Sequence, residues 1–394
     1  MWISYKAESN FRWYCFLFAF STILGMALTS NNGPCWSAET PQSPKFVTIP
    51  IYYLTDRELL GETYGPHRRY PSHCEHHMYY GTAMVNVPNV KRESADELWG
   101  TLGWQASDRR PGKVSSKDRI DPADPDASKI EFFQRLKAAL HRSGKPDLCV
   151  FVHGAADPFE DCLQDAADLA YCLQRPTVLY SWPSDPKRRG YFIDSSNSEW
   201  SQAHFNMFCK DLESFQSGVP LKVTFVSHSM GNRLVIRALP VLYGKGLVAD
   251  MELISPDIDA DTCRHYVMGY SRVHGTIRLY VSKRDKLLRL AQMLAGGYYR
   301  LGESADPLQK TPAVKADLLE RIDFTAIDTG FWGHTIPFQL VANMIHDGVP
   351  GKGLNLVEES TVHAAQPEKQ TRKSQGFKPA TSEIDIYKRV VRVK

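Results

Sequence analysis

The chain lacks a large excess of charge of either sign. Its 394 residues carry a formal net charge of only +3 at pH 7, and no basic cluster is interleaved with aromatic residues. We therefore expect no nucleic-acid partner, because such binding needs a concentrated basic surface. With 43% hydrophobic and 23% charged residues, the composition is ordinary for a globular protein. Function must be read from local groups of residues.

The sequence also lacks a clear membrane span near its N-terminus. An uncharged apolar run extends from Phe16 to Leu28 and follows Lys6 and Arg12. A membrane-spanning helix needs about 20 apolar residues, whereas a shorter run suits the apolar part of a signal peptide. We predict that residues 1–37 are a signal peptide or an N-terminal anchor. The protein is then exported to the periplasm or outside the cell, or associates with a membrane through this segment.

Cysteine and metal-ligand patterns are weak as well. Seven cysteines follow Cys15, and their spacing fits neither a disulfide framework nor a zinc site, so we expect mostly buried thiols. A Cys35–Cys74 bridge stays open. We expect no metal and no cofactor. Two groups of metal-ligating residue types lack the spacing of a metal site. The first consists of His67, His73, Cys74, His76 and His77. The second, Asp121, Asp124 and Asp126, also lacks the glycine of a calcium loop.

The most informative stretch that is present covers residues 221–233. An apolar, β-branched run from Leu221 to Val226 predicts a buried strand, and a helical pattern follows the turn Ser-His-Ser-Met-Gly. A strand, a sharp turn with serine at its apex and a helix are typical of a nucleophile elbow. The flanking small residues, Ser227 and Gly231, fit this strained turn. The pattern indicates that Ser229 is a nucleophile and that the Met230 N–H faces a developing oxyanion.

Strands and helices alternate on both sides of this stretch. Alternation with nearly continuous apolar strands indicates an α/β fold with a mostly parallel sheet, covered by helices on both faces. We predict one domain over 46–346 with insertions at 57–78 and 105–128, and a tail at 357–394 that is disordered apart from a short strand at 387–393. The expected strands are 46–54, 79–87, 148–152, 177–181, 221–226, 251–255, 276–282 and 322–327. The expected helices are 128–141, 159–173, 197–216, 230–242, 260–269, 286–296 and 336–345, with a mobile connection at 300–315.

A serine nucleophile needs a base and an acid that orients the base. In α/β-hydrolases these follow the serine in the order acid, then histidine. Asp285 ends a predicted strand and His334 follows the last one, so both should emerge at the carboxyl edge of the sheet with Ser229. Asp257 and Asp259, which follow the preceding predicted strand, remain rival acids, with Asp257 the stronger of the two. The rival histidines are His153, His265, His274, His346 and His228, whose side chain we expect to point away from the turn.

A second N–H is needed for the oxyanion, and Phe-Val-His-Gly at 151–154 offers it. A His-Gly turn after the first strand of the alternating region commonly presents the next backbone N–H, here that of Ala155. Four nearby residues are candidates for lining the pocket, although the tryptophan and its neighbours could equally pack in the core. They are His153, Trp182, Tyr191 and Asp194.

Six ordered motifs together resemble a known family. They are Phe-Val-His-Gly (151–154), Ser-Trp-Pro-Ser (181–184), Tyr191 with Asp194 and Trp200, His-Ser-Met-Gly-Asn (228–232), Ser-Pro-Asp-Ile-Asp (255–259) and Tyr-Val-Ser-Lys-Arg-Asp (280–285). The sequence resembles bacterial α/β-hydrolases of esterase/lipase type and unknown function over about residues 46–345, including Tyr53–Arg57 and Tyr80–Thr82. The resemblance implies the hydrolase fold and the triad. One departure is that the family usually has Tyr-Asn where this chain has Ala155-Ala156.

These observations predict a serine hydrolase that cleaves a carboxylic ester through an acyl-enzyme on Ser229. The substrate is then a small-molecule ester or a lipid. Two alternatives stay open: a lipase or acyltransferase that uses the same triad at a membrane surface, and a non-catalytic binding protein on a hydrolase fold.

Overall fold

The structure is a computed structural model. It describes residues 46–69, 78–89, 114–119, 125–186, 190–215, 221–242, 248–269, 275–303, 319–327, 332–335, 337–348, 356–358 and 387–393. The predicted leader (1–37), most of the 300–315 connection and residues Cys35, His73, Cys74, His76, His77, Asp121, Asp124 and His274 lie outside this part. The predictions that rest on them stay predictions. None of the described helices is long and apolar enough to cross a membrane.

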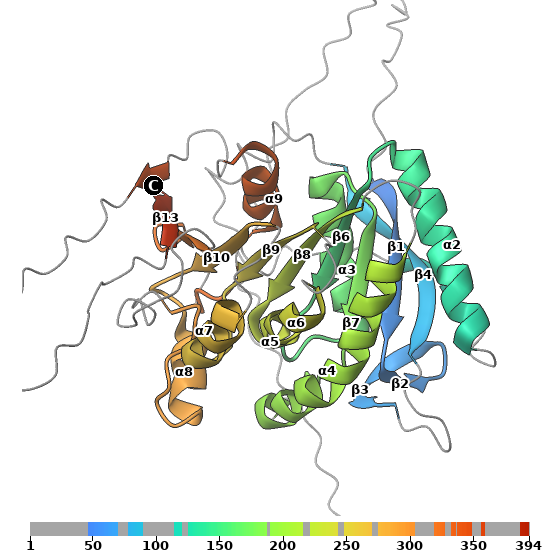
Figure 1. Ribbon diagram of the computed structural model, residues 1–394. Helices are drawn as coiled ribbons and strands as arrows, with labels where there is room; N and C mark the ends of the chain where they lie inside the picture. Colours follow the sequence, from blue (N-terminus) through green and yellow to red (C-terminus); the bar gives the residue numbers. More distant parts are fainter. Residues whose placement is uncertain are drawn as a thin grey trace, which may run out of the picture. The chain divides into compact units, whose positions relative to one another are not determined.

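The described residues build one large sheet with the strand order β12-β13-β11-β10-β9-β8-β6-β7-β1-β4-β5 (Figure 1). All strands from β13 to β1 in this order pair in parallel, whereas β4, β5 and β12 pair antiparallel. The strands are β1 (Phe46–Thr55), β4 (Tyr79–Pro88), β5 (Val114–Arg119), β6 (Asp147–Val152), β7 (Thr177–Ser181), β8 (Lys222–His228), β9 (Val248–Ile254), β10 (Ile277–Val281), β11 (Leu319–Asp323), β12 (Leu356–Glu358) and β13 (Tyr387–Val393). A separate hairpin joins β2 (Arg57–Leu60) to β3 (Thr63–Arg68).

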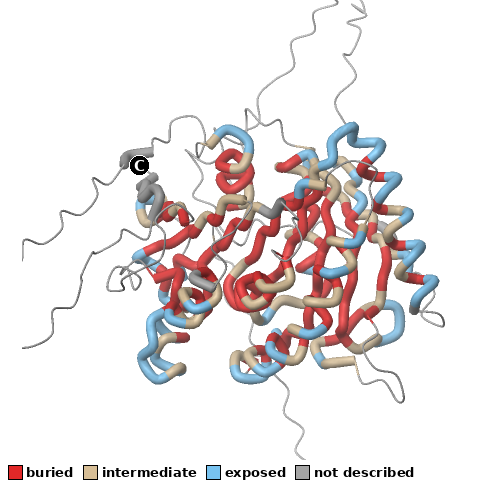
Figure 2. The backbone as a smooth tube through the Cα atoms, viewed as in Figure 1, coloured by how far each residue is buried: buried red, intermediate tan, exposed pale blue. Residues whose placement is uncertain are grey.

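Helices cover both faces of the sheet because the strands are apolar on both faces. In β1, Tyr52 and Leu54 belong to one core cluster, whereas Ile51 and Tyr53 belong to the other. Figure 1 shows α4, α5 and α6 in front of the strands, and Figure 2 shows the strands as the most buried layer. The helices are α2 (Pro125–Ser143), α3 (Phe159–Leu173), α4 (Gly190–Ser214), η2 (Ser229–Gly231), α5 (Asn232–Arg237), α6 (Leu239–Leu242), α7 (Ala260–Gly269), α8 (Lys286–Leu294) and α9 (Phe338–Asp347).

The two faces have separate cores. Helices α3 and α9 pack on one face, around Phe159, Leu163 and Val341. The other face is covered by α2 and α4–α7, with Phe132 and Phe205 in its core. This arrangement confirms the predicted mostly parallel sheet with helices on both faces.

The structure differs from the prediction mainly at the edges of the sheet. Within the predicted insertions, 114–119 forms β5 beside β4, and 57–68 contains the β2–β3 hairpin. The strand expected at 322–327 forms at 319–323 instead. The strand at 387–393 forms as expected and lies beside β11, so the sheet continues beyond the predicted boundary at 346. Polar edge strands carry a weak hydrophobic signal, because only part of their surface is buried.

The described cysteines carry free thiols. Cys149, Cys162, Cys209 and Cys263 are buried, and Cys172 is partly buried. Burial raises the pKa of the Cys149 thiol to about 12, so this side chain acts as a small apolar residue at neutral pH. For these five cysteines the structure agrees with the expectation of mostly buried thiols.

Candidate active site

The turn after β8 has the backbone geometry of a nucleophile elbow. Ser229 directly follows the strand and has a φ of 50°. This value lies in the left-handed region, which residues other than glycine rarely adopt. Gly231 must be glycine, because a Cβ there would lie 2.3 Å from the carbonyl oxygen of His153. The close approach of these two backbones places the end of β6 beside the turn. The strain at Ser229 is local, and the packing around it holds the turn in place.

Asn232 holds the serine turn in place through three side-chain hydrogen bonds, a role that is not evident from the sequence. Its side-chain oxygen accepts a hydrogen bond from the Ser227 hydroxyl at 2.7 Å. Its amide nitrogen donates to the carbonyl oxygens of Ser229 at 2.9 Å and Ile254 at 3.1 Å. Three bonds from one fully buried side chain thus tie the serine turn to β8 and β9. The only signal in the sequence was an asparagine after Met-Gly, which a helix start also explains.

His334 and Asp285 meet at the same edge of the sheet. The Nδ1 atom of His334 lies 2.7 Å from Oδ2 of Asp285, and both side chains are buried. The other carboxylate oxygen of Asp285 accepts the Leu288 N–H at 2.9 Å, so Asp285 also caps α8. A helix cap has a fixed orientation, which leaves Oδ2 aimed at the histidine. A carboxylate on Nδ1 leaves Nε2 as the nitrogen that can accept a proton.

The loop that carries His334 is anchored to the start of α8. The Lys286 N–H donates to the carbonyl oxygen of Trp332 at 2.9 Å. Gly333 follows with a φ of 66°, and a Cβ there would lie 2.4 Å from the carbonyl oxygen of Arg284. The loop therefore lies directly against the turn that presents Asp285. This contact holds the two side chains together although 49 positions separate them in the chain.

The His-Gly turn packs against the serine. A Cβ on Gly154 would lie 3.1 Å from Cβ of Ser229, so glycine permits the close approach. Asp157 accepts the Gly154 N–H at 3.1 Å, and Asp194 accepts the Ala156 N–H at 2.9 Å. Among the residues that the structure describes, none accepts a hydrogen bond from the intervening Ala155 N–H. Two carboxylates therefore hold the turn where the family resemblance implied Tyr-Asn.

A family model described as an alpha/beta hydrolase of unknown function (DUF900) matches residues 128–343, more than half of the chain. The chain belongs to this family. The matched segment contains Ser229, Asp285 and His334, and the parallel sheet is the scaffold that the family description implies. No curated protein matches the chain. The family assignment supports a hydrolase fold and leaves the reaction to be argued from the site.

Three of the four residues expected to line the pocket are buried around the His-Gly turn. His153, Trp182 and Asp194 are each fully buried, and the rings of His153 and Trp182 stack 5.0 Å apart. Burial contradicts the expectation that these three line the pocket. Their polar atoms are used inside the protein instead, as when the Trp182 indole N–H donates to the carbonyl oxygen of His153 at 2.9 Å. Tyr191 lines a pocket of about 280 Å³, but Ser229, Asp285 and His334 are not among the residues that line it, so its predicted place in the substrate pocket stays a prediction.

Arg57 is the residue that sequence reasoning missed at this site. Its guanidinium is buried and donates to the Asp157 carbonyl oxygen at 2.7 Å and to the Ser181 hydroxyl at 2.9 Å. It also lies 3.1 Å from Nε2 of His153. Because the guanidinium can only donate, Nε2 of His153 accepts and its Nδ1 donates to Gly154. One cation thus connects the ends of β1, β6 and β7 under the His-Gly turn.

The same guanidinium argues against a metal at the one candidate ligand group among the described residues. His153, Asp157 and Cys162 each offer a ligand atom within 4.8 Å of the others. Nη2 of Arg57, however, lies 3.1 Å from Nε2 of His153 and 3.8 Å from Sγ of Cys162. Burial also raises the pKa of the Cys162 thiol, and a thiol must be deprotonated to bind a metal. The group does not fit a metal ion.

The rival acid, Asp257, has other partners. Oδ2 accepts hydrogen bonds from Arg233 at 3.1 Å and from the Tyr191 hydroxyl at 3.0 Å. Oδ1 lies 3.3 Å from Nε of Arg300. The Asp257 N–H donates to the carbonyl oxygen of Ser229 at 3.0 Å. Asp257 therefore supports the serine turn as a buried ion-pair residue, and the geometry favours Asp285 as the partner of His334.

Two other histidines have identifiable structural roles. The rings of His228 and His334 lie 4.9 Å apart, and Nε2 of His228 is 3.4 Å from the carbonyl oxygen of His334. The expectation that His228 points away from the turn is wrong. The regular alternation of strand side chains ends where Ser229 adopts a positive φ, and His228 packs against the His334 loop. Nε2 of His346 lies 3.2 Å from the carbonyl oxygen of Leu173, far along α9.

The buried His153 predicts a pH dependence of stability. Burial lowers the pKa of His153 well below its usual value of 6.5, and the neighbouring Arg57 lowers it further. The unfolded chain then binds a proton below about pH 6.5 that the folded protein does not bind. Above this pH, His153 is neutral in both states and does not make stability depend on pH. Below it, the free energy of unfolding decreases as the pH falls, with a slope of up to about 1.4 kcal/mol per pH unit.

Urea unfolding measures this slope for the wild type and for His153→Asn. The pH is varied from about 7.5 to about 5, because histidine ordinarily titrates within this range. Other titrating groups contribute to both proteins alike, so the difference isolates His153. We expect the wild type to lose stability more steeply than the variant below about pH 6.5. Parallel pH profiles for the two proteins would show that His153 is not buried as a neutral side chain.

Proposed function

We propose that this protein is a serine hydrolase that cleaves a carboxylic ester of a small molecule or lipid through an acyl-enzyme on Ser229. The observation that carries the proposal is the 2.7 Å contact between His334 Nδ1 and Asp285 Oδ2 at the sheet edge where the strained Ser229 turn lies. The family assignment supports it at the level of the hydrolase fold. No cofactor is needed for this chemistry.

In the proposed mechanism, the Ser229 hydroxyl attacks the acyl carbon of the ester. His334 takes the hydroxyl proton on Nε2, and Asp285 holds the ring and stabilises its positive charge. The tetrahedral intermediate collapses, the alcohol leaves with the proton from His334, and the acyl group remains on Ser229. A water molecule, deprotonated by His334, then attacks the acyl-enzyme. The acid leaves and Ser229 recovers its proton.

The N–H groups of Met230 and Ala155 would stabilise the oxyanion. Met230 directly follows the nucleophile, and the Gly154–Ala155 turn packs against Cβ of Ser229. The Ala155 N–H lies between two amides whose acceptors are fixed carboxylates. Pre-oriented backbone donors of this kind typically contribute about 10²–10³-fold to the rate. Asp157 and Asp194 thus act as positioning residues for the proposed oxyanion site.

A fluorophosphonate probe tests the proposal, because it phosphonylates only activated serines. We expect the wild type to be labelled and Ser229→Ala to be unlabelled. Ser201→Ala is the matched control: it removes a buried serine hydroxyl of α4, and its labelling should equal that of the wild type. A folded wild type without labelling at Ser229 would contradict a serine hydrolase and favour a binding protein on a hydrolase fold.

A further inference from the structure

The outer face of α8 carries exposed apolar side chains. The helix buries Leu288 and Ala291 and turns Leu290, Met293 and Leu294 to solvent. Met293 is 75% exposed, far more than a side chain that packs in the fold. Figure 2 shows α8, at the lower left, as mostly exposed on its outer side. Apolar residues on a helix are usually buried in the core, so an apolar stripe on the solvent side indicates a binding surface.

The apolar stripe continues onto neighbouring segments. Tyr298 and Tyr299, which follow α8, are both more than half exposed. Trp332 is also half exposed, and its carbonyl oxygen accepts the N–H of Lys286 in the first turn of α8. Leu294 shares a pocket with Phe192 at the start of α4, and Phe192 is itself exposed. We call α8, Tyr298, Tyr299 and Trp332 the α8 surface.

The N-terminal end of the α8 surface is basic as well as apolar, whereas at its other end Leu294 shares a pocket with the carboxylates of Glu199 and Asp259. Four cations at its N-terminal end are exposed: Lys283, Arg284, Lys286 and Arg289. The only carboxylates within residues 283–303 are Asp285 and Glu303, and both are buried. The Asp285 carboxylate also contacts Nδ1 of His334. Cations beside exposed aromatic and aliphatic side chains on a short helix are typical of segments that lie in the interface of an anionic bilayer.

We propose that the α8 surface docks onto an anionic phospholipid bilayer. Leu290, Met293 and the tyrosines enter the headgroup region, while the cations contact lipid phosphates. The charge pattern favours this partner over a second copy of the chain, because two copies would bring like charges together. Asp285 caps α8 and Trp332 lies two positions before His334. Docking would therefore bring the hydrolase site to the bilayer, and it does not itself depend on catalysis.

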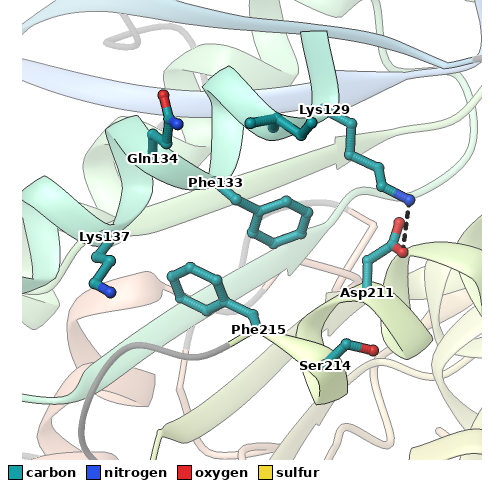
Figure 3. A pocket seen from close by; sticks show the side chains of 8 residues that line it. Lys129, Phe133, Gln134, Lys137, Asp211, Ser214 and Phe215 are labelled. Atoms are coloured by element: carbon teal, nitrogen blue, oxygen red, sulfur yellow. Dashed lines mark hydrogen bonds and ion pairs between the residues drawn. The ribbon is translucent and has the colours of Figure 1, made fainter. Parts of the chain in front are cut away.

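A matched surface for comparison lies elsewhere on the protein. Figure 3 shows an apolar groove between α2 and the end of α4, where the rings of Phe133 and Phe215 face each other at 5.1 Å. Ile130 in this groove is 59% exposed, and Lys137 is exposed beside it. Lys129 is paired with Asp211 at 2.8 Å. The groove offers exposed apolar and basic residues for control substitutions without the concentration of cations found on the α8 surface.

The experiment is co-sedimentation of the full chain with vesicles of phosphatidylcholine, with and without phosphatidylglycerol. All proteins carry Ser229→Ala, so binding is measured without turnover. We expect binding that requires phosphatidylglycerol and weakens with salt. Leu290→Gln with Met293→Gln should weaken it about tenfold or more, and Lys283→Gln with Arg284→Gln by about fivefold for each cation removed. The control variants Ile130→Gln and Lys137→Gln should bind as well as the parent.

Any contribution of the N-terminal apolar segment is common to all these proteins, so the comparison isolates the α8 surface. Equal binding by the parent and both α8 variants would overturn the proposal. So would binding to neither kind of vesicle, or a change of oligomeric state in the α8 variants without loss of vesicle binding. The last result would identify the surface as an interface between copies of the chain. None of these outcomes depends on whether Ser229 is a nucleophile.

Discussion

Replacement of Asp285 with asparagine is expected to reduce the rate of fluorophosphonate labelling at Ser229 by about 10⁴-fold, as expected when a triad loses its acid. The amide presents a donor to Nδ1 of His334, so the histidine adopts the tautomer with the proton on Nε2 and can no longer accept the proton of Ser229. The 2.7 Å contact between Nδ1 and Oδ2 is the observation behind this expectation. The second-order labelling rate measures the effect without any knowledge of the natural substrate.

The substitution is designed to leave the fold intact. Asparagine caps helices as well as aspartate does, so the bond from the Leu288 N–H to the side-chain oxygen is retained. Asp257→Asn provides the comparison, because it weakens the ion pairs with Arg233 and Arg300. It should lower the melting temperature and reduce labelling far less. If Asp257→Asn abolished labelling while Asp285→Asn labelled normally, Asp257 would be the acid.

Replacement of Arg57 with methionine is expected to lower the free energy of unfolding by about 3–5 kcal/mol, the cost of breaking a buried charged network. Arg57 is 1% exposed, and its guanidinium donates to the carbonyl oxygens of Asp157 and Ser184 and to the hydroxyl of Ser181. Each buried acceptor left without a donor costs about 1–3 kcal/mol. Because the His-Gly turn lies above this network, labelling of Ser229 should slow as well. Urea unfolding measures the change in stability.

Two further variants make the Arg57 result interpretable. Arg135→Met removes an arginine that pairs with Asp118 and Glu131 on the surface, and it should cost less than about 1 kcal/mol. Arg57→Lys keeps the charge but cannot reach all the acceptors at once. It should fall between the wild type and Arg57→Met, and it stays measurable if the methionine variant fails to fold. Equal losses for Arg57→Met and Arg135→Met would contradict a central role for Arg57.

Much of the fold could be predicted because parallel, buried strands leave a strong local signal. The strand Thr177–Ser181 and the helices Phe159–Leu173 and Ala260–Gly269 have the bounds that the sequence predicted. The polar strand β5 was missed, because an edge strand needs little apolar surface. The position of Ser229 in its turn was also predictable, since small residues on both sides and a strand–helix junction are local features.

Local patterns in the sequence were enough to predict the alternating strands and helices from residue 148 onward, the strained serine turn and the edge of the sheet to which Asp285 and His334 belong. These depend on patterns within a few residues and on the rule that parallel strands end at one edge. The folded structure was needed to see that Asp285 rather than Asp257 contacts His334, and that Arg57 and Asp194 hold the His-Gly turn. Such contacts join loops that are distant in the chain, so they depend on how the strands are aligned, and no local pattern contains that information.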